Sequence, residues 1–432
     1  MSAKKNNLIK LFSSNILVKP FWFLYTYAII GLLGKNDFGS FTLILAVVTI
    51  ATQLLDIGLV NRTYVLLNDQ KITKAFNSSS VASVLLAFRY WLSMIVISLS
   101  LIAVFILPHS YRLQIIAASM LFVGMYVTQQ YRVIFRSYEL FSLEAISVAL
   151  ERVFVIIMTL DLFFTGSDYQ TYSLRYGLAY VIFLFTLIVF HYKKLGKFGL
   201  FISWHDIKLL FQQGGSMYIN NIILSLRQRT PFFILEHIAG RSVVGLYSSA
   251  YRFVESYMFI PNSIVQVSYA KFSRDSNQKE TLRKDVFKTH LLIVLITLLS
   301  VIFGFLLMPY IVQYILGDEF TPYINDYRLA ILIFIPNGSY YLWTSITNVL
   351  HIQHKVNRLY IFNFSILVIS QIIFYNYLGI KGSILSMLLS EFVMILEYHI
   401  AIGSKEKFFH SRLIDVALFL ITAIVAFTLT FS

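Results

Sequence analysis

The sequence contains no cysteine and few charged side chains, and both shortages narrow the functions that it can encode. Without cysteine, disulfide bonds and thiolate metal sites are excluded. Only 13% of the 432 residues are charged, whereas soluble globular domains contain about 25%. Long hydrophilic segments are also missing, as are the HExxH motif, a phosphate-binding P-loop and a Ser/His/Asp spacing typical of hydrolases. We therefore expect neither an enzyme nor a cofactor.

Apolar runs make up most of the chain, which is 58% hydrophobic and has a mean hydropathy of +0.72. The runs are about 18 to 25 residues long, enough for a helix to cross a hydrocarbon core of roughly 30 Å. This pattern predicts an all-α, polytopic membrane protein. We expect membrane spans near 8–33, 39–67, 80–108, 112–138, 141–165, 172–192, 206–239, 241–271, 286–316, 322–352, 358–380, 382–403 and 411–431.

The loops between these spans alternate between basic loops and loops that are poor in Lys and Arg. The basic set contains Lys4, Lys5, Lys10, Lys71, Lys74, Arg132, Arg136, Lys193, Lys194, Lys197, Lys271, Arg274, Lys279, Arg283, Lys284, Lys288, Lys355, Arg358, Lys405 and Lys407. The positive-inside rule places this set and the N-terminus in the cytoplasm, and an odd last span then places the C-terminus outside. The net charge of +14 is accordingly explained by the basic loops on the cytoplasmic side, and nucleic acid is not an expected partner.

The two halves of the chain share one plan. A segment from Leu8 and a segment from Asp206 each begin with an amphipathic "IKL", continue into a long span with a proline, and reach a short turn followed by Gly39 or Gly245. Copies that run in the same direction predict a parallel repeat around a central cavity. We expect an N-terminal lobe at 1–200 and a C-terminal lobe at 201–403, each of six helices, with one additional helix at 404–432.

Two stretches carry a resemblance to a known family. The run LLGKNDFGSFTLILAVVTIATQLLDIGLVNRTYV (32–65), with its G-x-F opening and L-D-I-G-L, resembles the first turn and second helix of the polysaccharide-transport family. GLYSSAYRFVESYMFIP (245–261) resembles that family's eighth helix. The family includes O-antigen flippases and belongs to the multidrug/oligosaccharidyl-lipid/polysaccharide exporter superfamily. The resemblance implies two lobes around a lumen and transfer of an undecaprenyl-diphosphate-linked oligosaccharide between leaflets, and the additional helix departs from the twelve-span core.

Among the cations of the predicted spans, four are candidates for substrate contact, since an ionisable side chain deep in a bilayer costs on the order of 2.5–3.5 kcal/mol. They are Lys19, Arg227, Arg229 and Arg252. Together they would form a cationic lumen for a diphosphate, which arginine matches with its planar fork of donors. The alternative is that each cation pairs with a carboxylate and only joins helices. It has most support at Arg252, because Glu255 follows at i+3 on the same helix face.

The spacing of the two neighbouring arginines limits what they can do together. Arg227 and Arg229 point about 200° apart on a helix, so we expect only one of them to face the lumen, with Arg227 favoured by its depth. Pro231 removes the backbone hydrogen bond to Arg227. We also consider Pro20, Pro231, Pro336 and Gly338 as hinges or helix breaks.

The carboxylates Asp56, Asp161, Glu255 and Glu391 are candidate counter-charges or sites for a coupling ion, either H+ or Na+. For Asp56, which belongs to L-D-I-G-L, a structural role is favoured. Glu144, Glu151 and Glu397 are further candidates, and the adjacent Glu151 and Arg152 are expected near the cytoplasmic surface. Arg132 and Arg136 lie one turn apart and are expected to meet lipid phosphates.

These observations favour a flippase of the bacterial inner membrane that works by alternating access. The expected partners are a lipid-linked oligosaccharide, membrane lipids and, further along the pathway, a polysaccharide polymerase and chain-length proteins. A cation-coupled multidrug exporter is the alternative within the superfamily, although it would need a cavity dominated by carboxylates and aromatics. A membrane-embedded polymerase fits less well, because no large segment outside the membrane is present.

Overall fold

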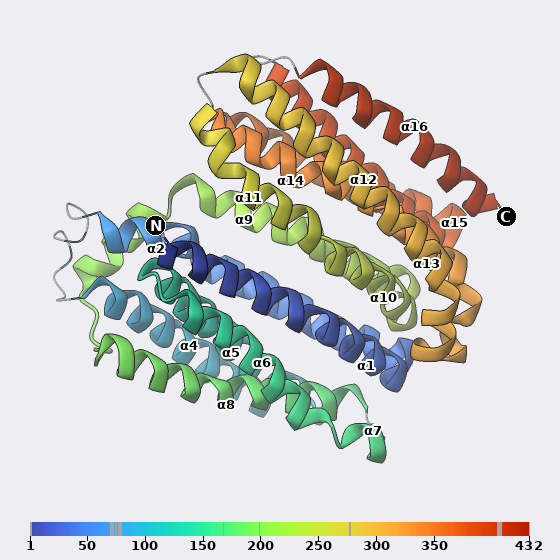
Figure 1. Ribbon diagram of the computed structural model, residues 1–432. Helices are drawn as coiled ribbons and strands as arrows, with labels where there is room; N and C mark the ends of the chain where they lie inside the picture. Colours follow the sequence, from blue (N-terminus) through green and yellow to red (C-terminus); the bar gives the residue numbers. More distant parts are fainter. Residues whose placement is uncertain are drawn as a thin grey trace. The chain divides into compact units, whose positions relative to one another are not determined.

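The computed structural model describes residues 2–69, 73, 76, 80–166, 168–197, 199–275, 278–403 and 408–431. Side chains are not described at 2–19, 61, 213–217, 220, 270, 353–354, 357 and 409. All regular elements of the described part are helices (Figure 1), which confirms the predicted all-α class. The chain divides into two compact units: unit 1 is Met1–Leu33 with Ser40–Leu226, and unit 2 is Gly34–Gly39 with Arg227–Ser432. The boundary between Leu226 and Arg227 thus lies inside a helix, whereas the predicted boundary between the lobes, at residue 200, lies before that helix.

Unit 1 is built around α5, which packs on α4 and α8, and α8 packs in turn on α6. Apolar side chains from these helices form its core, with Val127, Tyr131 and Phe183 fully buried. The helices are α1 (Ser2–Asp56), α2 (Leu59–Asn68), α4 (Val81–Ile106), α5 (His109–Ser137), α6 (Phe141–Thr159), α7 (Leu162–Thr165), α8 (Tyr169–Leu195) and the first part of α9 (Trp204–Ala239).

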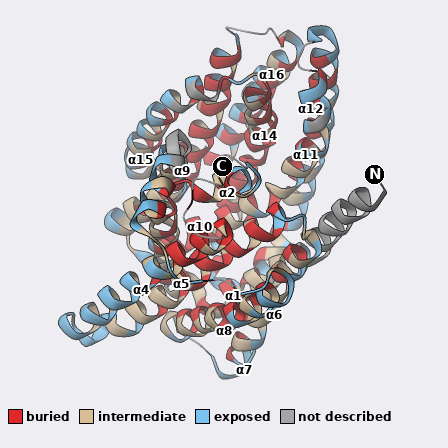
Figure 2. Cartoon of the chain, turned by 90° about the vertical axis from the view of Figure 1, so that its left-hand side faces the viewer, coloured by how far each residue is buried: buried red, intermediate tan, exposed pale blue. Residues whose placement is uncertain are grey.

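Unit 2 is built around α14, whose residues are mostly buried and which packs on α11, α12, α15 and α16. Figure 2 shows that α10 is largely buried, whereas the C-terminal end of α4 is exposed. The elements of unit 2 after α9 are α10 (Arg241–Tyr257), α11 (Phe259–Arg274), α12 (Lys279–Ile311), the π-helical η2 (Val312–Leu316), the 3₁₀-helical η3 (Asp318–Tyr323), α13 (Ile324–Ile331), α14 (Phe334–Val349), α15 (Gln353–Gly403) and α16 (Phe409–Phe431).

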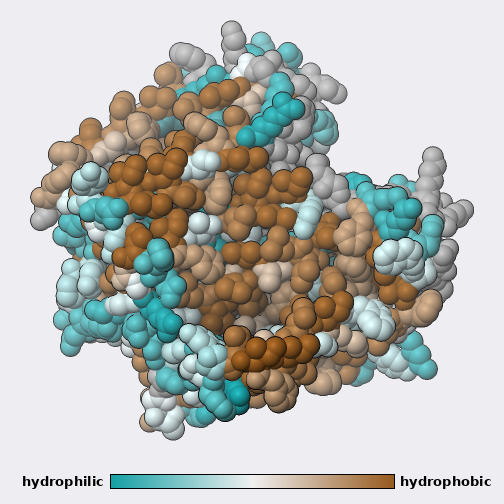
Figure 3. Space-filling model, turned by 180° about the vertical axis from the view of Figure 1, so that it is seen from behind, coloured by the Kyte–Doolittle hydropathy of each residue, from teal (hydrophilic) through white to brown (hydrophobic). Residues whose placement is uncertain are grey.

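Eight segments of the described chain are long and apolar enough to cross a membrane. Two of them, Pro20–Asp56 and Arg358–Gly403, contain a glycine with positive φ that divides a long helix in two: Gly34 at 69° and Gly379 at 60°. Glycine adopts this left-handed backbone without the steric cost of a Cβ. Hydrophobic side chains cover much of the face shown in Figure 3, and many large apolar side chains are exposed, as lipid-facing helices require. The protein is therefore a multi-pass membrane protein, and the count of two lobes of six spans stays a prediction.

Two predicted spans, 241–271 and 322–352, are each divided into two helices. Both α11 and α14 begin with Phe-Ile-Pro-Asn, which places Pro261 and Pro336 in their first turns. A proline has no backbone N–H, so it cannot donate a hydrogen bond to the carbonyl four positions earlier, which is that of Tyr257 for Pro261 and that of Leu332 for Pro336. α10 ends at Tyr257, and α13 ends one residue before Leu332. The break in the tenth span therefore lies just before Pro336, and both Pro336 and Gly338, which we considered as hinges or helix breaks, lie within the helical backbone of α14.

Pro20 and Pro231 lie inside continuous helices, so the break that we expected at Lys19–Pro20 does not occur. In α1 the non-helical residue is Gly34 instead. Pro309 also lies inside its helix, where it frees the carbonyl of Phe305. Arg328 donates from Nε to this carbonyl at 3.4 Å. Pro309 is thus tolerated within its helix because a neighbouring side chain accommodates the freed carbonyl.

The two glycines of the predicted repeat pack against each other's turns within unit 2. A Cβ at Gly39 would overlap the backbone of Arg241 and Gly245, and a Cβ at Gly245 would overlap the backbone of Lys35. Both positions therefore need glycine because two backbones approach closely there. Lys35 is further held by Glu319, with 3.5 Å between Nζ and Oε1.

Candidate functional site

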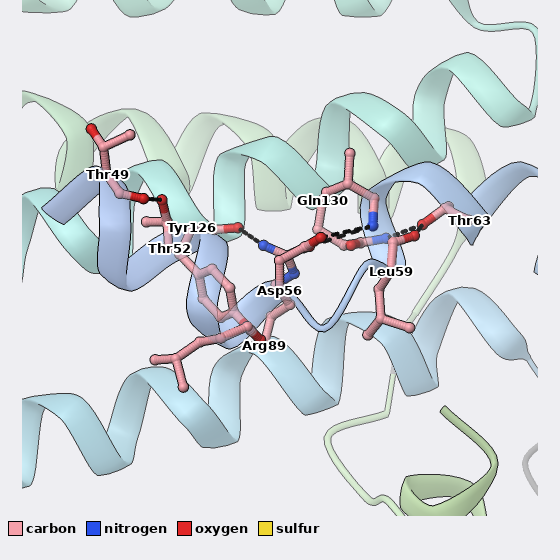
Figure 4. Close-up of polar contacts among 10 residues, drawn as sticks. Thr49, Thr52, Asp56, Leu59, Thr63, Arg89, Tyr126 and Gln130 are labelled. Carbon is pink, nitrogen blue, oxygen red and sulfur yellow. Dashed lines mark hydrogen bonds and ion pairs between the residues drawn. The ribbon is translucent and has the colours of Figure 1, made fainter. Parts of the chain in front are cut away.

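Unit 1 buries an ion pair between Asp56 and Arg89, whose exposed fractions are 1% and 0%. Arg89 also donates from Nη1 to the carbonyl of Tyr126 at 2.7 Å, and its guanidinium lies 4.0 Å from the centre of that tyrosine ring (Figure 4). Asp56 ends α1, and Ile57 and Gly58, both with positive φ, form the turn to α2. The L-D-I-G-L motif is therefore a turn whose aspartate is bound to α4, the kind of contact that a structural role requires.

The same network joins α5 to α1 and α2. Tyr126 donates from its hydroxyl to the carbonyl of Leu55 at 2.6 Å, and Gln130 donates from Nε2 to Thr63 Oγ1 at 3.0 Å (Figure 4). Thr63 in turn donates to the carbonyl of Leu59 at 2.7 Å. Arg89 was not among the predicted residues. The sequence nevertheless indicated this residue, because Arg89 is a lone arginine in the apolar run 80–108.

Arg132 and Arg136, which we expected at lipid phosphates, both have carboxylate partners on α6. Arg132 donates from Nη2 to Glu151 Oε2 at 2.5 Å, and Arg136 pairs with Glu144. Arg136 keeps 59% of its side chain exposed, so it can still reach a headgroup, whereas Arg132 is 21% exposed. Contact with lipid stays a prediction for both.

Arg152 is a cation of unit 1 for which the described residues provide no carboxylate within ion-pair distance. Its guanidinium lies 4.4 Å from the centre of the Trp22 ring, and its Nε and Nη1 are buried without a hydrogen-bond partner among the described residues. Trp22 packs beside Tyr25, with 5.1 Å between the ring centres. The neighbouring Glu151 does not neutralise Arg152 by contact, because adjacent helix residues point about 100° apart and Glu151 is bound to Arg132. The expected position of Glu151 and Arg152 near the cytoplasmic surface stays a prediction.

In unit 2, Arg227 is bound by Glu391 of α15. Its Nη1 and Nη2 both donate to Glu391 Oε1, at 2.9 and 2.6 Å, and the two residues are only 4% and 3% exposed. This is the helix-joining contact that formed the alternative to substrate binding. Contact between Arg227 and a substrate stays a prediction.

Arg229 and Arg252 share a different carboxylate, Glu255 of α10. Arg252 donates to Glu255 Oε2 at 2.7 Å and Arg229 to Oε1 at 3.4 Å. The side chains of Arg229, Arg252 and Glu255 are 16%, 24% and 25% exposed, so this cluster is the more accessible one. The spacing of about 200° sends Arg227 and Arg229 to carboxylates on different helices. Arg227, which its depth favoured for the lumen, is the more buried of the two, and which of them faces a lumen stays a prediction.

The remaining predicted residues lie apart from these clusters. Asp161 pairs with Arg175 and keeps 54% of its side chain exposed, which is a surface contact. Lys19 lies outside the residues whose side chains are described. Gly338 packs tightly in unit 2, since a Cβ there would lie 2.8 Å from Thr297 Oγ1. Gly338 is thus a packing position inside α14, and a hinge role stays a prediction.

The hydrophilic loop after α11 is partly neutralised by its own carboxylates. Lys271 donates from Nζ to Asp285 Oδ1 at 2.6 Å, and Arg274 from Nε to Asp275 Oδ1 at 3.0 Å. The hydrogen bond from Arg274 lowers the pKa of Asp275 below its ordinary value. The loop therefore presents fewer free positive charges than its composition suggests.

Unit 2 also contains an unmatched carboxylate, Glu397 on α15. It is 3% exposed, and neither of its carboxylate oxygens has a hydrogen-bond partner among the described residues. A buried charge without a partner is rare in membrane helices and marks candidate functional positions. Over the same described residues, no group of three or more His, Cys, Asp and Glu side chains has the geometry to hold a metal ion.

Comparisons with known proteins agree with this architecture. The family model described as "Polysaccharide biosynthesis protein" matches residues 30–325. A search among curated proteins found no match. The inward-facing structure of a multidrug resistance MATE family transporter of the MOP superfamily aligns with a TM-score of 0.70 and 16% identity, over 91% of this chain and 94% of that one.

Two further solved structures align over nearly the whole chain. Lipid II flippase MurJ in an inward closed conformation has a TM-score of 0.69 and 14% identity, over 98% of this chain and 97% of that one. A MOP superfamily transporter from Pyrococcus furiosus, whose binding pocket is described as having reverse polarity, has a TM-score of 0.61 and 14% identity, over 96% of each chain. At these identities the likeness shows the fold alone, which this chain shares with these transporters.

Proposed function

The chain belongs to the polysaccharide biosynthesis protein family, and we propose that it is a flippase for undecaprenyl-diphosphate-linked oligosaccharide units. It moves them from the cytoplasmic to the outer leaflet of the bacterial inner membrane by alternating access. The units belong to O-antigen or a similar surface polysaccharide. Similarity in fold to a Lipid II flippase supports a lipid-linked substrate, and the fold itself is that of membrane transporters.

The observation that carries the proposal is the charge balance of the α9–α10 region in unit 2. Three guanidinium groups, those of Arg227, Arg229 and Arg252, contact the carboxylates of Glu391 and Glu255. At the more exposed cluster two of them, Arg229 and Arg252, share Glu255, so these three side chains together carry one net positive charge. A diphosphate supplies the negative charge that this cluster lacks, and its oxygens accept from arginine in a bidentate manner.

Orientation and partners follow from the same proposal. The basic loops place the N-terminus in the cytoplasm, where the oligosaccharide would be assembled on its lipid. After release in the outer leaflet the unit would meet a polysaccharide polymerase and chain-length proteins. A cationic lumen shared by both lobes remains part of the proposal.

The test removes the excess charge without leaving a buried carboxylate unpaired. Arg252→Gln retains the contact between Arg229 and Glu255, so the cluster becomes neutral and the fold should be kept. We expect transfer of a lipid-linked oligosaccharide between the leaflets of proteoliposomes to fall at least about tenfold, which corresponds to about 1.4 kcal/mol. Transfer is measured at matched protein amounts with an accessible sugar label.

Two variants sharpen this test. Glu255→Gln increases the positive excess, so transfer should persist even if thermal stability falls. Arg136→Gln removes an arginine that is mostly exposed, and it should leave transfer unchanged. Unchanged transfer in Arg252→Gln would contradict the proposal.

A multidrug exporter is the second candidate, and Glu397 is the observation that favours it. A buried carboxylate without a hydrogen-bond partner among the described residues can bind an organic cation, and the transporter with a TM-score of 0.70 is a multidrug resistance protein. If the same proteoliposomes expel a cationic dye, if Glu397→Gln abolishes this efflux, and if no glycolipid is transferred, the exporter is the correct function.

A further inference from the structure

Asp415 of α16 lies at the centre of a buried polar cluster in unit 2. Its Oδ1 accepts from Ser339 Oγ at 2.6 Å and lies 3.2 Å from His290 Nε2. Its Oδ2 accepts from Trp343 Nε1 at 2.8 Å and contacts His399 Nε2, also at 2.8 Å. The side chain of His290 is fully buried and that of Asp415 is 5% exposed. The cluster therefore joins α12, α14, α15 and α16 through one carboxylate.

The arrangement of donors determines which protons the cluster already holds. A carboxylate offers about four acceptor positions, and here Ser339, Trp343 and His399 are its hydrogen-bond partners. His290 Nε2 lies 3.2 Å from Oδ1 and 3.1 Å from Ser339 Oγ. Asp415 is thus an acceptor throughout, and both imidazoles direct Nε2 towards it. The Nδ1 atoms of His290 and His399 are buried and have no hydrogen-bond partner in the described part of the chain. Each imidazole has a nitrogen at which another proton can bind.

Charge balance favours the uptake of one proton. With both imidazoles neutral the cluster carries one negative charge, and with one imidazolium it is neutral. A neutral, hydrogen-bonded cluster is cheaper to bury in apolar surroundings than a charged one. Imidazole is also the side chain whose charge ordinarily changes between about pH 5 and pH 8.

Other ionisable groups on the packed helices do not occupy the carboxylate. Arg412 of α16 donates from Nη2 to the backbone carbonyl of His399 at 3.0 Å. His410 packs edge-on against Phe287 of α12, with 5.9 Å between the ring centres. α14 contributes only Ser339 and Trp343 to the contacts with Asp415. The Nε2 atoms are turned to the carboxylate as hydrogen-bond partners, and the described residues include no group suited to a metal ion.

We propose that His290, His399 and Asp415 form a proton-binding site in unit 2 which takes up one proton on acidification and makes H+ the coupling ion. The second half of this statement rests on the proposed transport function. The first half is a property of the cluster alone.

The position of the site explains how a proton could alter the protein. α16 is held at its far end by Lys381, which donates from Nζ to the carbonyls of Leu429 at 3.2 Å and Thr430 at 3.0 Å. Near its start it is held by Asp415. Protonation changes the charge at this second attachment only, where α12, α14 and α15 meet it. The proton therefore acts on the contact between α16 and the α14 core.

Trp343 provides a reporter within the cluster. Its ring lies edge-on to both imidazoles, with 4.6 Å between its ring centre and that of His399 and 5.7 Å for His290. Imidazolium quenches indole fluorescence more strongly than neutral imidazole does. The full chain with Trp22→Phe, Trp91→Phe and Trp204→Phe keeps Trp343 as its single tryptophan. We expect its fluorescence to fall reversibly between about pH 8 and pH 5, the range in which imidazoles titrate.

Three variants of this single-tryptophan protein assign the change. His399→Gln and His290→Asn together should abolish the fall. Asp415→Asn should reduce it, because the counter-charge of the imidazolium is lost, and His109→Gln in unit 1 should leave it unchanged. Fluorescence that does not depend on pH in the parent, or a fall that persists without both imidazoles, overturns the site. His399→Gln alone keeps the test decisive if Asp415→Asn does not fold.

A transport assay tests the coupling role separately from proton binding. In proteoliposomes we expect a pH gradient to accelerate glycolipid transfer in the parent, and His399→Gln to remove this acceleration while downhill transfer continues. A parent that transfers glycolipid without responding to the gradient overturns the coupling role. A parent that transfers no glycolipid overturns the proposed function instead, and the fluorescence experiment still decides whether the cluster binds a proton.

Discussion

The two units balance their buried charges differently. In unit 1 the carboxylates Asp56, Glu144 and Glu151 each have an arginine partner, and Arg152 is a cation without a carboxylate partner among the described residues. In unit 2 one carboxylate is shared by two arginines, another is surrounded by imidazoles, and a third, Glu397, has no hydrogen-bond partner among the described residues.

This difference separates charges that join helices from charges that are free to bind something else. A one-to-one buried pair is satisfied, and removing one partner leaves an uncompensated charge. A shared carboxylate or an unmatched ion retains unused capacity. By this criterion the Asp56–Arg89 pair is structural, while Arg152, the Glu255 cluster, Glu397 and the Asp415 cluster are the positions at which substrate or protons can act.

Breaking the pair in unit 1 should have the largest effect. Arg89→Met leaves the carboxylate of Asp56 buried without a cation, which costs about 3–5 kcal/mol of stability. Thermal unfolding in detergent measures the loss. Arg89→Met combined with Asp56→Leu should recover most of it, whereas the exposed Arg136→Met should cost less than about 1 kcal/mol. If the single variant is as stable as the parent, the pair is not a structural contact.

The corresponding change in unit 2 should cost less. Glu391→Gln removes the partner of Arg227, yet Glu397 lies on the same helix and interacts electrostatically with Arg227. We expect a loss of about 1–3 kcal/mol, in the range of an imperfectly satisfied buried group. Glu391→Gln with Glu397→Gln should cost as much as Arg89→Met. An equal loss from the single and double variants would show that Glu397 is not a reserve partner.

Arg152→Gln tests the unmatched cation of unit 1. Its stacking on Trp22 contributes about 0.5–2 kcal/mol, so the loss of stability should be small. Transfer of the lipid-linked oligosaccharide should fall more than stability does if Arg152 meets the diphosphate, and Arg152→Lys should restore part of it. A fall in transfer that only follows the amount of folded protein would assign Arg152 to packing.

Glu397→Gln should have the smallest effect on stability. It removes a buried carboxylate that has no hydrogen-bond partner among the described residues, so unfolding should change by less than about 1 kcal/mol or shift towards higher stability. Glycolipid transfer should stay within about a factor of five, the ratio that corresponds to 1 kcal/mol. A large loss of stability would show that Glu397 has a partner.

Particular residues show which parts of the site could be predicted. The contact between Arg252 and Glu255 was the alternative that the sequence supported best, because it is local, at i and i+3 on one helix. The contact between Arg227 and Glu391 joins residues 164 positions apart, and no helical pattern relates them. Arg152 was named beside Glu151, but its stacking on Trp22 joins residues 130 positions apart, which no local pattern relates. The breaks before Pro261 and Pro336 follow from the proline four residues on, yet Pro20 and Pro231 have the same signal without a break.

The sequence by itself determined the all-α class and the membrane setting, because the bilayer thickness sets the length of an apolar run. It also determined the family, through short motifs such as L-D-I-G-L. Only the tertiary structure decided which charges are satisfied. A buried ion takes its partner from whichever helix packs against it, and that choice depends on packing between segments far apart in the chain. For this reason the cluster around Asp415, whose side chains come from four helices, became visible only in the folded protein.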